Sequence, residues 1–514
     1  MKKSGKRIFS AALALICALI PALAAQAEEA GEQNEFEAAL QASYDIKPDT
    51  NSIEGWPQGP QIYGHSGIVM DMDSGAVLYE KQADERHYPA SITKILTALV
   101  ALENSVPEDE VYFSEDSVAF MEYGDASIGM TPGEFLSRKD AMYGMLLASA
   151  NEVSYAIAES VGKLMGGDYN TFIQEMNDRA KELGCTGSNW VNANGLHDEQ
   201  HYTTARDMAL ISSAAYQFDE FRTVTQTLEY TIGETNLMKE TRTFQQNHKM
   251  LWPGNYYYYE NCTGGKTGYT DQSRTTLVTM AEKDGLRLVA VILQDDGDVY
   301  VDTQAMFDYA YGNFSKVYLK DQNMPEEISS YTEEAPYVLL PSGVEFSSLE
   351  KDIVIEDEAD ASGTVTFYYE GQNVGSTEVV LTEAYIDEVQ AAEDSADGAA
   401  DGTAEGNGSD EAGFSSGNLL IRVLICAGAA VLLLIIVFMI VARYRYLKKK
   451  RMRAARRRRQ NAARAQRQQM SGSTGSGRPR PGAGGHPGPY PGVEQRRVRM
   501  QEEPRRRDRN GRYR

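Results

Sequence analysis

Cysteine and histidine are both scarce in this chain, with four and six residues among 514. Two of the cysteines, Cys17 and Cys426, lie within apolar runs near the two ends of the chain. Cys185 and Cys262 remain in the central part, where at most one disulfide can therefore form. Their positions in the sequence leave open whether they pair.

The first 27 residues have the pattern of an export signal. A basic start from Met1 to Arg7 precedes an apolar run from Ile8 to Leu23, and the small-residue end Ala25-Gln26-Ala27 follows. The apolar run contains Pro21 and falls short of the roughly 20 residues that span a bilayer, which disfavours a permanent N-terminal anchor. We expect a signal peptide over 1–27 and a mature chain that begins near Glu28.

A second apolar segment, from about Val423 to Ala442, is long enough to cross a membrane. Clustered arginines and lysines follow from Arg443 to Arg459, and such clusters stay on the cytoplasmic side. We therefore expect a single transmembrane helix over 418–442. The part of the chain before this helix would then lie outside the cytoplasm.

The formal net charge of −24 conceals an uneven distribution, because basic residues crowd the segment 443–514. Frequent Gly, Ser and Pro leave this segment too little apolar surface for a core, so a disordered cytoplasmic tail is predicted. Directly inside a membrane, such a tail gains about 1 kcal/mol per charge from anionic lipid. We expect a membrane-lipid partner and no nucleic acid.

Two acidic segments flank the folded part. Residues 391–417 consist almost wholly of Ala, Gly, Asp, Glu and Ser, which predicts a flexible tether. Residues 28–60 form an acidic N-terminal segment that we expect to be mobile to about Gln58.

Between these segments the pattern runs from strands to helices and back to strands. Alternating apolar residues around Asp73-Ser74-Gly75 predict one β-hairpin, and Thr275–Ala281 with Leu286–Leu293 predict a second. A helix is predicted to start at Ser91, and helical spacing predicts further helices over Lys139–Ala148, Val153–Leu164 and Tyr169–Leu183, the last ended by Gly184.

This order favours an α+β domain over 61–324, an antiparallel sheet covered by helices. Short β-type runs after Met324 predict a small all-β domain over 325–390. These runs are Tyr337–Leu340, Ile353–Ile355, Thr364–Tyr369 and Thr377–Leu381.

Three short segments carry residues suited to nucleophilic catalysis: Ser91-Ile92-Thr93-Lys94, Ser149-Ala150-Asn151 and Lys266-Thr267-Gly268. Ser91 and Lys94 are three residues apart at a predicted helix start, so they share one face. A lysine held neutral by burial or neighbouring cations can take the serine proton, and a helix N-terminus favours developing negative charge.

The other two segments offer groups that can complete such a site. Ser149 and Asn151 follow a predicted helix, where Ser149 can relay protons and Asn151 can bind an amide. The third segment is predicted to lie just before a strand, and its flanking glycines permit close approach of an extended peptide. Each segment alone is weak evidence, but the three in this order make a chance match improbable, at roughly one in twenty.

These motifs, with four longer segments, resemble the low-molecular-weight penicillin-binding proteins that act as serine-type D-alanyl-D-alanine carboxypeptidases, peptidase family S11. The longer segments are Asp73–Glu80, Tyr88–Lys94, Asn192–Leu196 and Gly265–Thr270. The resemblance covers about Gln61 to Gln390. It implies a penicillin-recognising serine transpeptidase/β-lactamase-like fold and a role in cell-wall maturation. The implied substrate is a peptidoglycan stem peptide ending in D-Ala-D-Ala, and β-lactam antibiotics would be covalent inhibitors.

The resemblance also implies residue roles. Ser91 would be the nucleophile, Lys94 the general base and Ser149 a proton relay. The substrate-binding groups would be Asn151, Lys266, Thr267, Gly268 and the backbone N–H of Tyr269, which would form the oxyanion hole with that of Ser91. Terminal D-alanine would leave and water would then resolve the acyl-enzyme, without a metal or organic cofactor.

One loop departs from the family pattern. Relatives can use a basic residue after the last strand to hold the substrate carboxylate, whereas this chain has Gln294-Asp295-Asp296-Gly297-Asp298. Arg274 or Thr267 would have to supply that contact. His197 and His201 invite a catalytic role, but a lysine base is already in place, so we interpret both as structural or surface residues.

Two alternative functions remain from the sequence. A serine β-lactamase shares the three motifs but needs an additional base for rapid deacylation, and a catalytically idle cell-wall-binding scaffold would not need Ser91, Lys94 and Lys266 together. The sequence leaves open whether endopeptidase activity accompanies carboxypeptidase activity, and whether the role is vegetative or sporulation-related.

Overall fold

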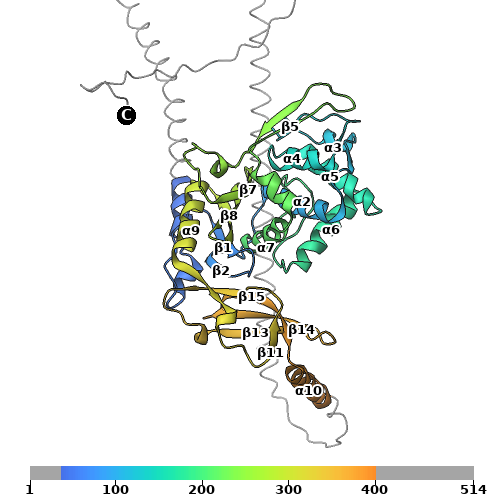
Figure 1. Ribbon diagram of the computed structural model, residues 1–514. Coiled ribbons are helices and arrows are strands. Elements are labelled where there is room, and N and C mark those ends of the chain that lie inside the picture. Colours follow the sequence, from blue (N-terminus) through green and yellow to red (C-terminus); the bar gives the residue numbers. More distant parts are fainter. Residues whose placement is uncertain (1–35, 401–514) are drawn as a thin grey trace, which may run out of the picture. The chain divides into compact units, whose positions relative to one another are not determined.

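The computed structural model describes residues 36–400 (Figure 1). The expected signal peptide over 1–27, transmembrane helix over 418–442 and basic tail over 443–514 lie outside the described residues. Within residues 36–400, no helix combines the length and apolar character that crossing a bilayer requires.

Within this part of the chain, five strands form one antiparallel sheet in the order β2-β1-β9-β8-β7. The strands are β1 (Ser66–Asp71), β2 (Val77–Lys81), β7 (Cys262–Thr270), β8 (Arg274–Lys283) and β9 (Leu286–Asp295). The hairpins β1-β2 and β8-β9 confirm the two hairpins predicted from the sequence. β7 pairs with β8 alone and so forms an edge of this sheet.

Apolar side chains on both faces hold the sheet between two cores, because successive strand residues point to opposite sides. Ile68 and Met70 of β1 pack with the helices α2, α5 and α7, whereas Val69 packs with Met306 of α9 on the other face. The helices are α2 (Lys94–Asn104), α3 (Asp116–Ala119), α4 (Arg138–Leu146), α5 (Asn151–Leu164), α6 (Tyr169–Glu182), α7 (Ala205–Tyr216), α8 (Asp219–Gln226), α9 (Val299–Asn313) and α10 (Glu383–Ala400). The predicted α+β arrangement of an antiparallel sheet covered by helices is confirmed.

The helices α4, α5 and α6 confirm the three predicted after the first hairpin. Gly184 follows α6 with a φ of +86°, the left-handed conformation in which glycine commonly ends helices. The helix predicted from Ser91 differs in its first turn, which is the 3₁₀ turn η2 (Ala90–Thr93), and α2 begins at Lys94.

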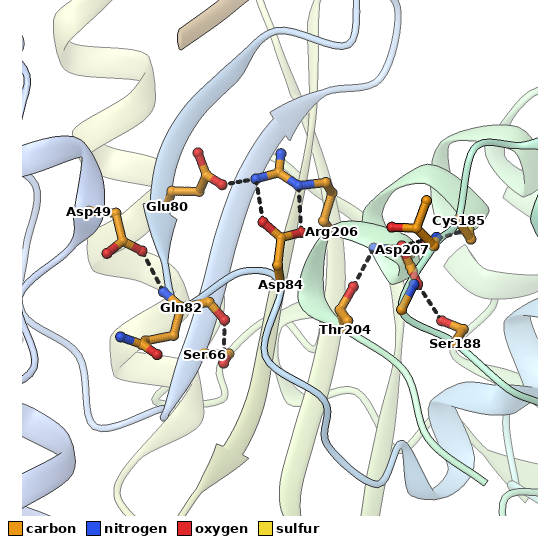
Figure 2. A network of polar contacts seen from close by, with 12 residues as sticks. Asp49, Ser66, Glu80, Gln82, Asp84, Cys185, Ser188, Thr204, Arg206 and Asp207 are labelled. Carbon is orange, nitrogen blue, oxygen red and sulfur yellow. Dashed lines mark hydrogen bonds and ion pairs between the residues drawn. The ribbon is translucent and has the colours of Figure 1, made fainter. Parts of the chain in front are cut away.

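The acidic segment before the sheet is ordered over residues 36–58, so the expectation of mobility is wrong there. Residues 36–45 are helical, and η1 (Asp49–Ser52) follows. The indole of Trp56 is 4% exposed and donates to Leu78 O at 3.2 Å. The Asp49 carboxylate accepts from the Gln82 N–H at 2.7 Å (Figure 2). Tertiary contacts with β2 thus order a segment whose local composition favours disorder.

The predicted β-type runs after Met324 are strands. A four-stranded antiparallel sheet has the order β11-β15-β14-β13, and β10 pairs with β12. These strands are β10 (Phe314–Tyr318), β11 (Ile328–Tyr331), β12 (Tyr337–Pro341), β13 (Glu350–Asp357), β14 (Ser362–Tyr369) and β15 (Gln372–Leu381). α10 then occupies residues up to Ala400, so residues 391–400 are helical where a flexible tether was predicted. The rest of that predicted tether lies outside the described residues.

Polar contacts join this all-β region to the first hairpin. The Tyr337 hydroxyl donates to Asp71 Oδ2 at 2.9 Å, and the Ser376 N–H donates to Ser74 O at 2.7 Å.

Two short ribbons and several 3₁₀ turns complete the described elements. They are β3 (Glu110–Tyr112) with β4 (Phe135–Ser137), β5 (Glu229–Ile232) with β6 (Arg242–Gln245), η3 (Lys249–Leu251), η4 (Leu319–Asp321) and η5 (Phe346–Ser348).

Candidate active site

Ser91 lies on η2, a turn held tightly against the edge strand β7. The Thr276 hydroxyl of β8 donates to Pro89 O at 2.8 Å, which fixes the start of the turn. A Cβ added to Gly268 would lie 2.9 Å from Ser91 N, closer than real Cβ contacts permit. The strand can pass this close to the serine because position 268 carries no side chain.

Lys94 places its amine beside the Ser91 hydroxyl. Lys94 Nζ lies 2.9 Å from Ser91 Oγ, 2.8 Å from Asn151 Oδ1 and 2.6 Å from Asn194 O. The side chain is fully buried. Burial first, and the nearby Lys266 cation second, hold the pKa of Lys94 well below its usual value. The structure thus places an amine whose charged form is disfavoured within hydrogen-bond distance of a serine hydroxyl.

A second lysine–serine pair lies opposite the first. Lys266 Nζ donates to Ser149 Oγ at 3.0 Å and to Thr267 O at 2.7 Å. Ser149 has a φ of +62°, a strained conformation for a residue with a side chain, and it lies just before α5, which begins at Asn151. Burial lowers the pKa of Lys266 to about 7. The three predicted motifs are therefore brought together, linked by the contacts of Lys94 and Lys266.

The third motif lies inside β7, whereas the sequence placed it just before a strand. Its residues alternate in exposure: Lys266 and Gly268 are buried, Thr267 is half-buried and Tyr269 is exposed. Gly265 has a φ of +156°, and a Cβ there would meet Val278 O at 2.3 Å. An edge strand offers unpaired backbone groups to an extended peptide, so β7 presents its outer side as a template for strand addition.

The acidic loop that departs from the family pattern is occupied by internal contacts. Asp295 is buried beside Asp302, and burial followed by this second carboxylate raises the pKa of Asp295. Asp296 pairs with Arg274 (Nε to Oδ1, 3.4 Å), and Asp298 accepts from the Tyr257 hydroxyl at 2.8 Å. Each acid therefore has a structural partner, and Arg274, one of the two suggested carboxylate contacts, carries an ion pair.

The two histidines considered from the sequence have structural surroundings. His201 is 1% exposed, and its Nε2 lies 2.8 Å from Thr93 Oγ1, which itself donates to Ala90 O at 2.8 Å. His201 therefore braces the turn that carries the nucleophile. His197 is exposed and packs edge-on against the Tyr88 ring. The sequence left the pairing of Cys185 and Cys262 open, and both are free thiols.

One functional contact escaped the sequence analysis. The backbone carbonyl of Asn194 accepts from Lys94 at 2.6 Å, and a Cβ on the adjacent Gly195 would lie 1.8 Å from Ala90 O. The segment Asn192–Leu196 was noted only for its resemblance. Its Asn-Gly step indicates a tight turn, but nothing local indicates which lysine that turn would meet.

A serine hydroxyl beside a desolvated amine, with a second buried lysine opposite, defines a site able to perform acyl transfer with a lysine base. Comparison with known proteins agrees with this class. The family model for D-alanyl-D-alanine carboxypeptidase, peptidase S11, matches residues 54–297.

The curated relatives of this chain include D-alanyl-D-alanine carboxypeptidases. D-alanyl-D-alanine carboxypeptidase DacF of Bacillus subtilis is 28% identical over 343 residues, which covers 62% of this chain and 85% of DacF. DacB2 of Mycobacterium tuberculosis is 30% identical over 269 residues, 50% of this chain and 84% of DacB2. The Streptomyces K15 DD-transpeptidase structure has 25% identity and a TM-score of 0.45, covering 50% of this chain and 100% of that one. This chain belongs to the D-alanyl-D-alanine carboxypeptidase family, peptidase S11.

Proposed function

We propose that this protein is a serine-type D-alanyl-D-alanine carboxypeptidase that removes the terminal D-alanine from peptidoglycan stem peptides. The observation that carries the proposal is the 2.9 Å contact between Ser91 Oγ and Lys94 Nζ, with Lys94 fully buried. A neutral amine at this distance can accept the hydroxyl proton, which is what converts serine into a nucleophile.

In acylation, Ser91 Oγ attacks the carbonyl carbon of the penultimate D-alanine while Lys94 Nζ takes the hydroxyl proton. The developing oxyanion would be held by the backbone N–H groups of Ser91 and Tyr269. This pairing is geometrically reasonable because β7 passes Ser91 N at close range, as the 2.9 Å clearance at Gly268 indicates.

Collapse of the intermediate breaks the peptide bond, and the amine of the terminal D-alanine must receive a proton. Ser149 would relay to it the proton that Lys94 took from Ser91, which returns Lys94 to its neutral form. The Ser149 hydroxyl lies 3.0 Å from Lys266 Nζ, which holds it in place. Water then attacks the acyl-enzyme and its proton passes to Lys94, which gives that proton to Ser91 Oγ as the ester bond breaks.

The substrate backbone would add to the outer side of β7, in the orientation that brings its C-terminal carboxylate near Thr267 and Lys266. Asn151 would bind the side of the peptide opposite β7. Because Arg274 already pairs with Asp296, we assign the carboxylate contact to Thr267 and Lys266 first.

We further propose that the catalytic region lies outside the cytoplasmic membrane. The basis is the sequence alone: an export signal before it and an apolar segment followed by clustered basic residues after it. Protease added to intact cells should then digest the region 36–400 and leave the tail beyond Arg443 intact. We propose that this tail binds anionic lipid.

The test is labelling of the full-length chain with a fluorescent penicillin, followed by intact-mass spectrometry and a D-Ala-D-Ala-terminated pentapeptide assay. We expect a stable adduct on Ser91 and release of one D-alanine, both abolished in Ser91→Ala. Ser213→Ala is the matched control, because this half-buried serine on α7 bonds only within its own helix. Rapid penicillin turnover would instead indicate a β-lactamase, and a chain that forms no adduct would indicate an idle wall-binding scaffold.

A further inference from the structure

Two histidines and a glutamate gather at the start of the central sheet, apart from the three catalytic motifs. His65 directly precedes β1, and Glu85 and His87 follow β2 on the segment that leads to η2. One ligand-type atom from each of the three lies within 4.8 Å of the others. The rings of His65 and His87 are 5.3 Å apart in an edge-on arrangement.

The contact between His65 and Glu85 has the spacing of two metal ligands. His65 Nδ1 lies 3.5 Å from Glu85 Oε2, and this buried nitrogen makes no hydrogen bond within the described residues. The distance exceeds the usual N–H···O range of about 2.7–3.2 Å. Two ligands about 2.0–2.1 Å from a tetrahedral zinc ion stand roughly 3.4 Å apart, which matches the observed separation.

His87 has the support that a metal-binding histidine requires. The Ser66 hydroxyl donates to Gln82 O at 2.7 Å (Figure 2), so it accepts from His87 Nε2, which lies 2.8 Å away. That bond fixes the tautomer and leaves the lone pair on Nδ1.

The lone pair of His87 faces a second acceptor. Gln294 Oε1 lies 2.7 Å from His87 Nδ1. Two acceptors at this distance repel each other. The contact becomes favourable when the amide turns its NH₂ toward the ring or when a cation lies beside both atoms.

We propose that His65, Glu85 and His87 form a binding site for a divalent transition-metal ion, with zinc the best match to the ligand set. Two imidazole nitrogens and one carboxylate oxygen are a ligand combination that zinc accepts, and they leave a fourth position for water. Mg²⁺ and Ca²⁺ prefer sites built from oxygen alone.

The place of the site in the fold suggests a structural role. His87 lies four residues before Ser91, and its backbone pairs with Thr203 through two hydrogen bonds of 2.8 and 2.9 Å. An ion bound to all three side chains would fasten the start of β1 to the segment that carries the nucleophile. Metal binding would therefore stabilise the fold, by the general coupling of ligand binding to folding.

The experiment is isothermal titration of Zn²⁺ into the full-length chain, purified without a histidine tag and freed of metal by chelation. We expect one zinc per chain, a raised unfolding temperature, and no comparable effect of Mg²⁺. Co²⁺ bound at the same site should give the visible absorption of a nitrogen- and oxygen-ligated ion. Absence of zinc binding would overturn the proposal.

Two variants connect binding to these side chains. His65→Gln and Glu85→Gln should each weaken zinc affinity by at least about tenfold, since even the loss of a group supporting a ligand costs this much. His197→Gln is the matched control, because this histidine is exposed and lies outside the cluster. Penicillin labelling of Ser91 reports that each variant is folded. Unchanged zinc affinity in both labelled variants would show that the metal binds elsewhere and would refute the site.

Discussion

Lys81 and Lys94 are both fully buried lysines, yet they lie in opposite electrostatic surroundings. Lys81, at the end of β2, donates to the backbone carbonyls of Ser43, Ile62 and Gly64 at 2.7–2.8 Å. Lys94 also has three oxygen partners, at 2.6–2.9 Å. The number of hydrogen bonds is therefore the same in the two regions.

The charges nearby distinguish the two lysines. Burial lowers the pKa of Lys81 to about 8, against the opposing effect of the Asp302 and Asp295 carboxylates. Burial also holds the pKa of Lys94 well below its usual value, and the second largest influence, from Lys266, lowers it as well. At neutral pH Lys81 is thus mainly an ammonium ion, whereas both leading influences on Lys94 disfavour its protonated form. The same residue type serves structure in one region and base chemistry in the other, according to its charged neighbours.

The largest effect is expected where the neutral amine is removed. Lys94→Met should slow acylation of Ser91 by penicillin on the order of 10³-fold, within the range attributed to general bases. Lys94→Arg should be equally impaired, because a guanidinium does not release its proton at these pH values. Stopped-flow labelling measures the rate. Lys163→Met, at an exposed lysine of α5, is the control and should label normally. A Lys94→Met rate within tenfold of wild type would exclude Lys94 as the base.

The structural lysine should show the converse behaviour. Lys81→Met should leave the acylation rate nearly unchanged but lower the free energy of unfolding by about 3 kcal/mol, because three carbonyls and the buried Asp302 lose their cation. Urea denaturation measures the loss, and Lys163→Met should change stability by less than about 1 kcal/mol. If Lys81→Met were as stable as wild type, the buried acids would not depend on this ammonium.

The catalytic lysine was predictable from sequence and the structural one was not. Ser91 and Lys94 share a helix start, so their spacing alone indicates contact. The partners of Lys81 come from distant segments, including one expected to be mobile. Ser43 belongs to that acidic segment, which tertiary contacts hold in place rather than any local preference.

The position of β7 was also difficult to predict from the sequence. Cys262–Thr270 contains Gly264, Gly265 and Gly268, which weaken any alternating strand pattern. Pairing with β8 over the whole strand outweighs that local weakness. The glycines are required by close contacts with Thr225, Val278 and Ser91, and sequence alone cannot reveal those neighbours. Motif chemistry was thus readable from the sequence, whereas the surroundings that set pKa values required the fold.

A third test uses the pH dependence of stability. The pKa of Lys266 is lowered from its usual 10.5 to about 7 by burial, so between these pH values the unfolded chain binds more protons than the folded one. The contribution of Lys266 to the free energy of unfolding therefore rises as the pH increases from about 7 to 10.5. The stability of wild type relative to Lys266→Met should increase by at least roughly 2 kcal/mol across that interval, as measured by urea unfolding at each pH. A pH-independent difference would show that Lys266 keeps an ordinary pKa.

The smallest expected effect comes from giving Lys94 the kind of neighbour that Lys81 has. Asn151→Asp replaces the amide oxygen 2.8 Å from Lys94 Nζ with a carboxylate of the same shape. An adjacent negative charge favours the protonated amine, so the pKa of Lys94 should rise. Acylation should fall about tenfold at neutral pH and recover as the pH is raised.

The pH profile separates this electrostatic effect from a lost substrate contact. Asn170→Asp, an exposed position on α6, is the control and should leave the profile unchanged. A deficit in Asn151→Asp that persists at alkaline pH would mean that the Asn151 NH₂ group acts on the substrate. Recovery at alkaline pH would mean that one negative charge beside Lys94 raises the pKa of this lysine toward that of the structural Lys81.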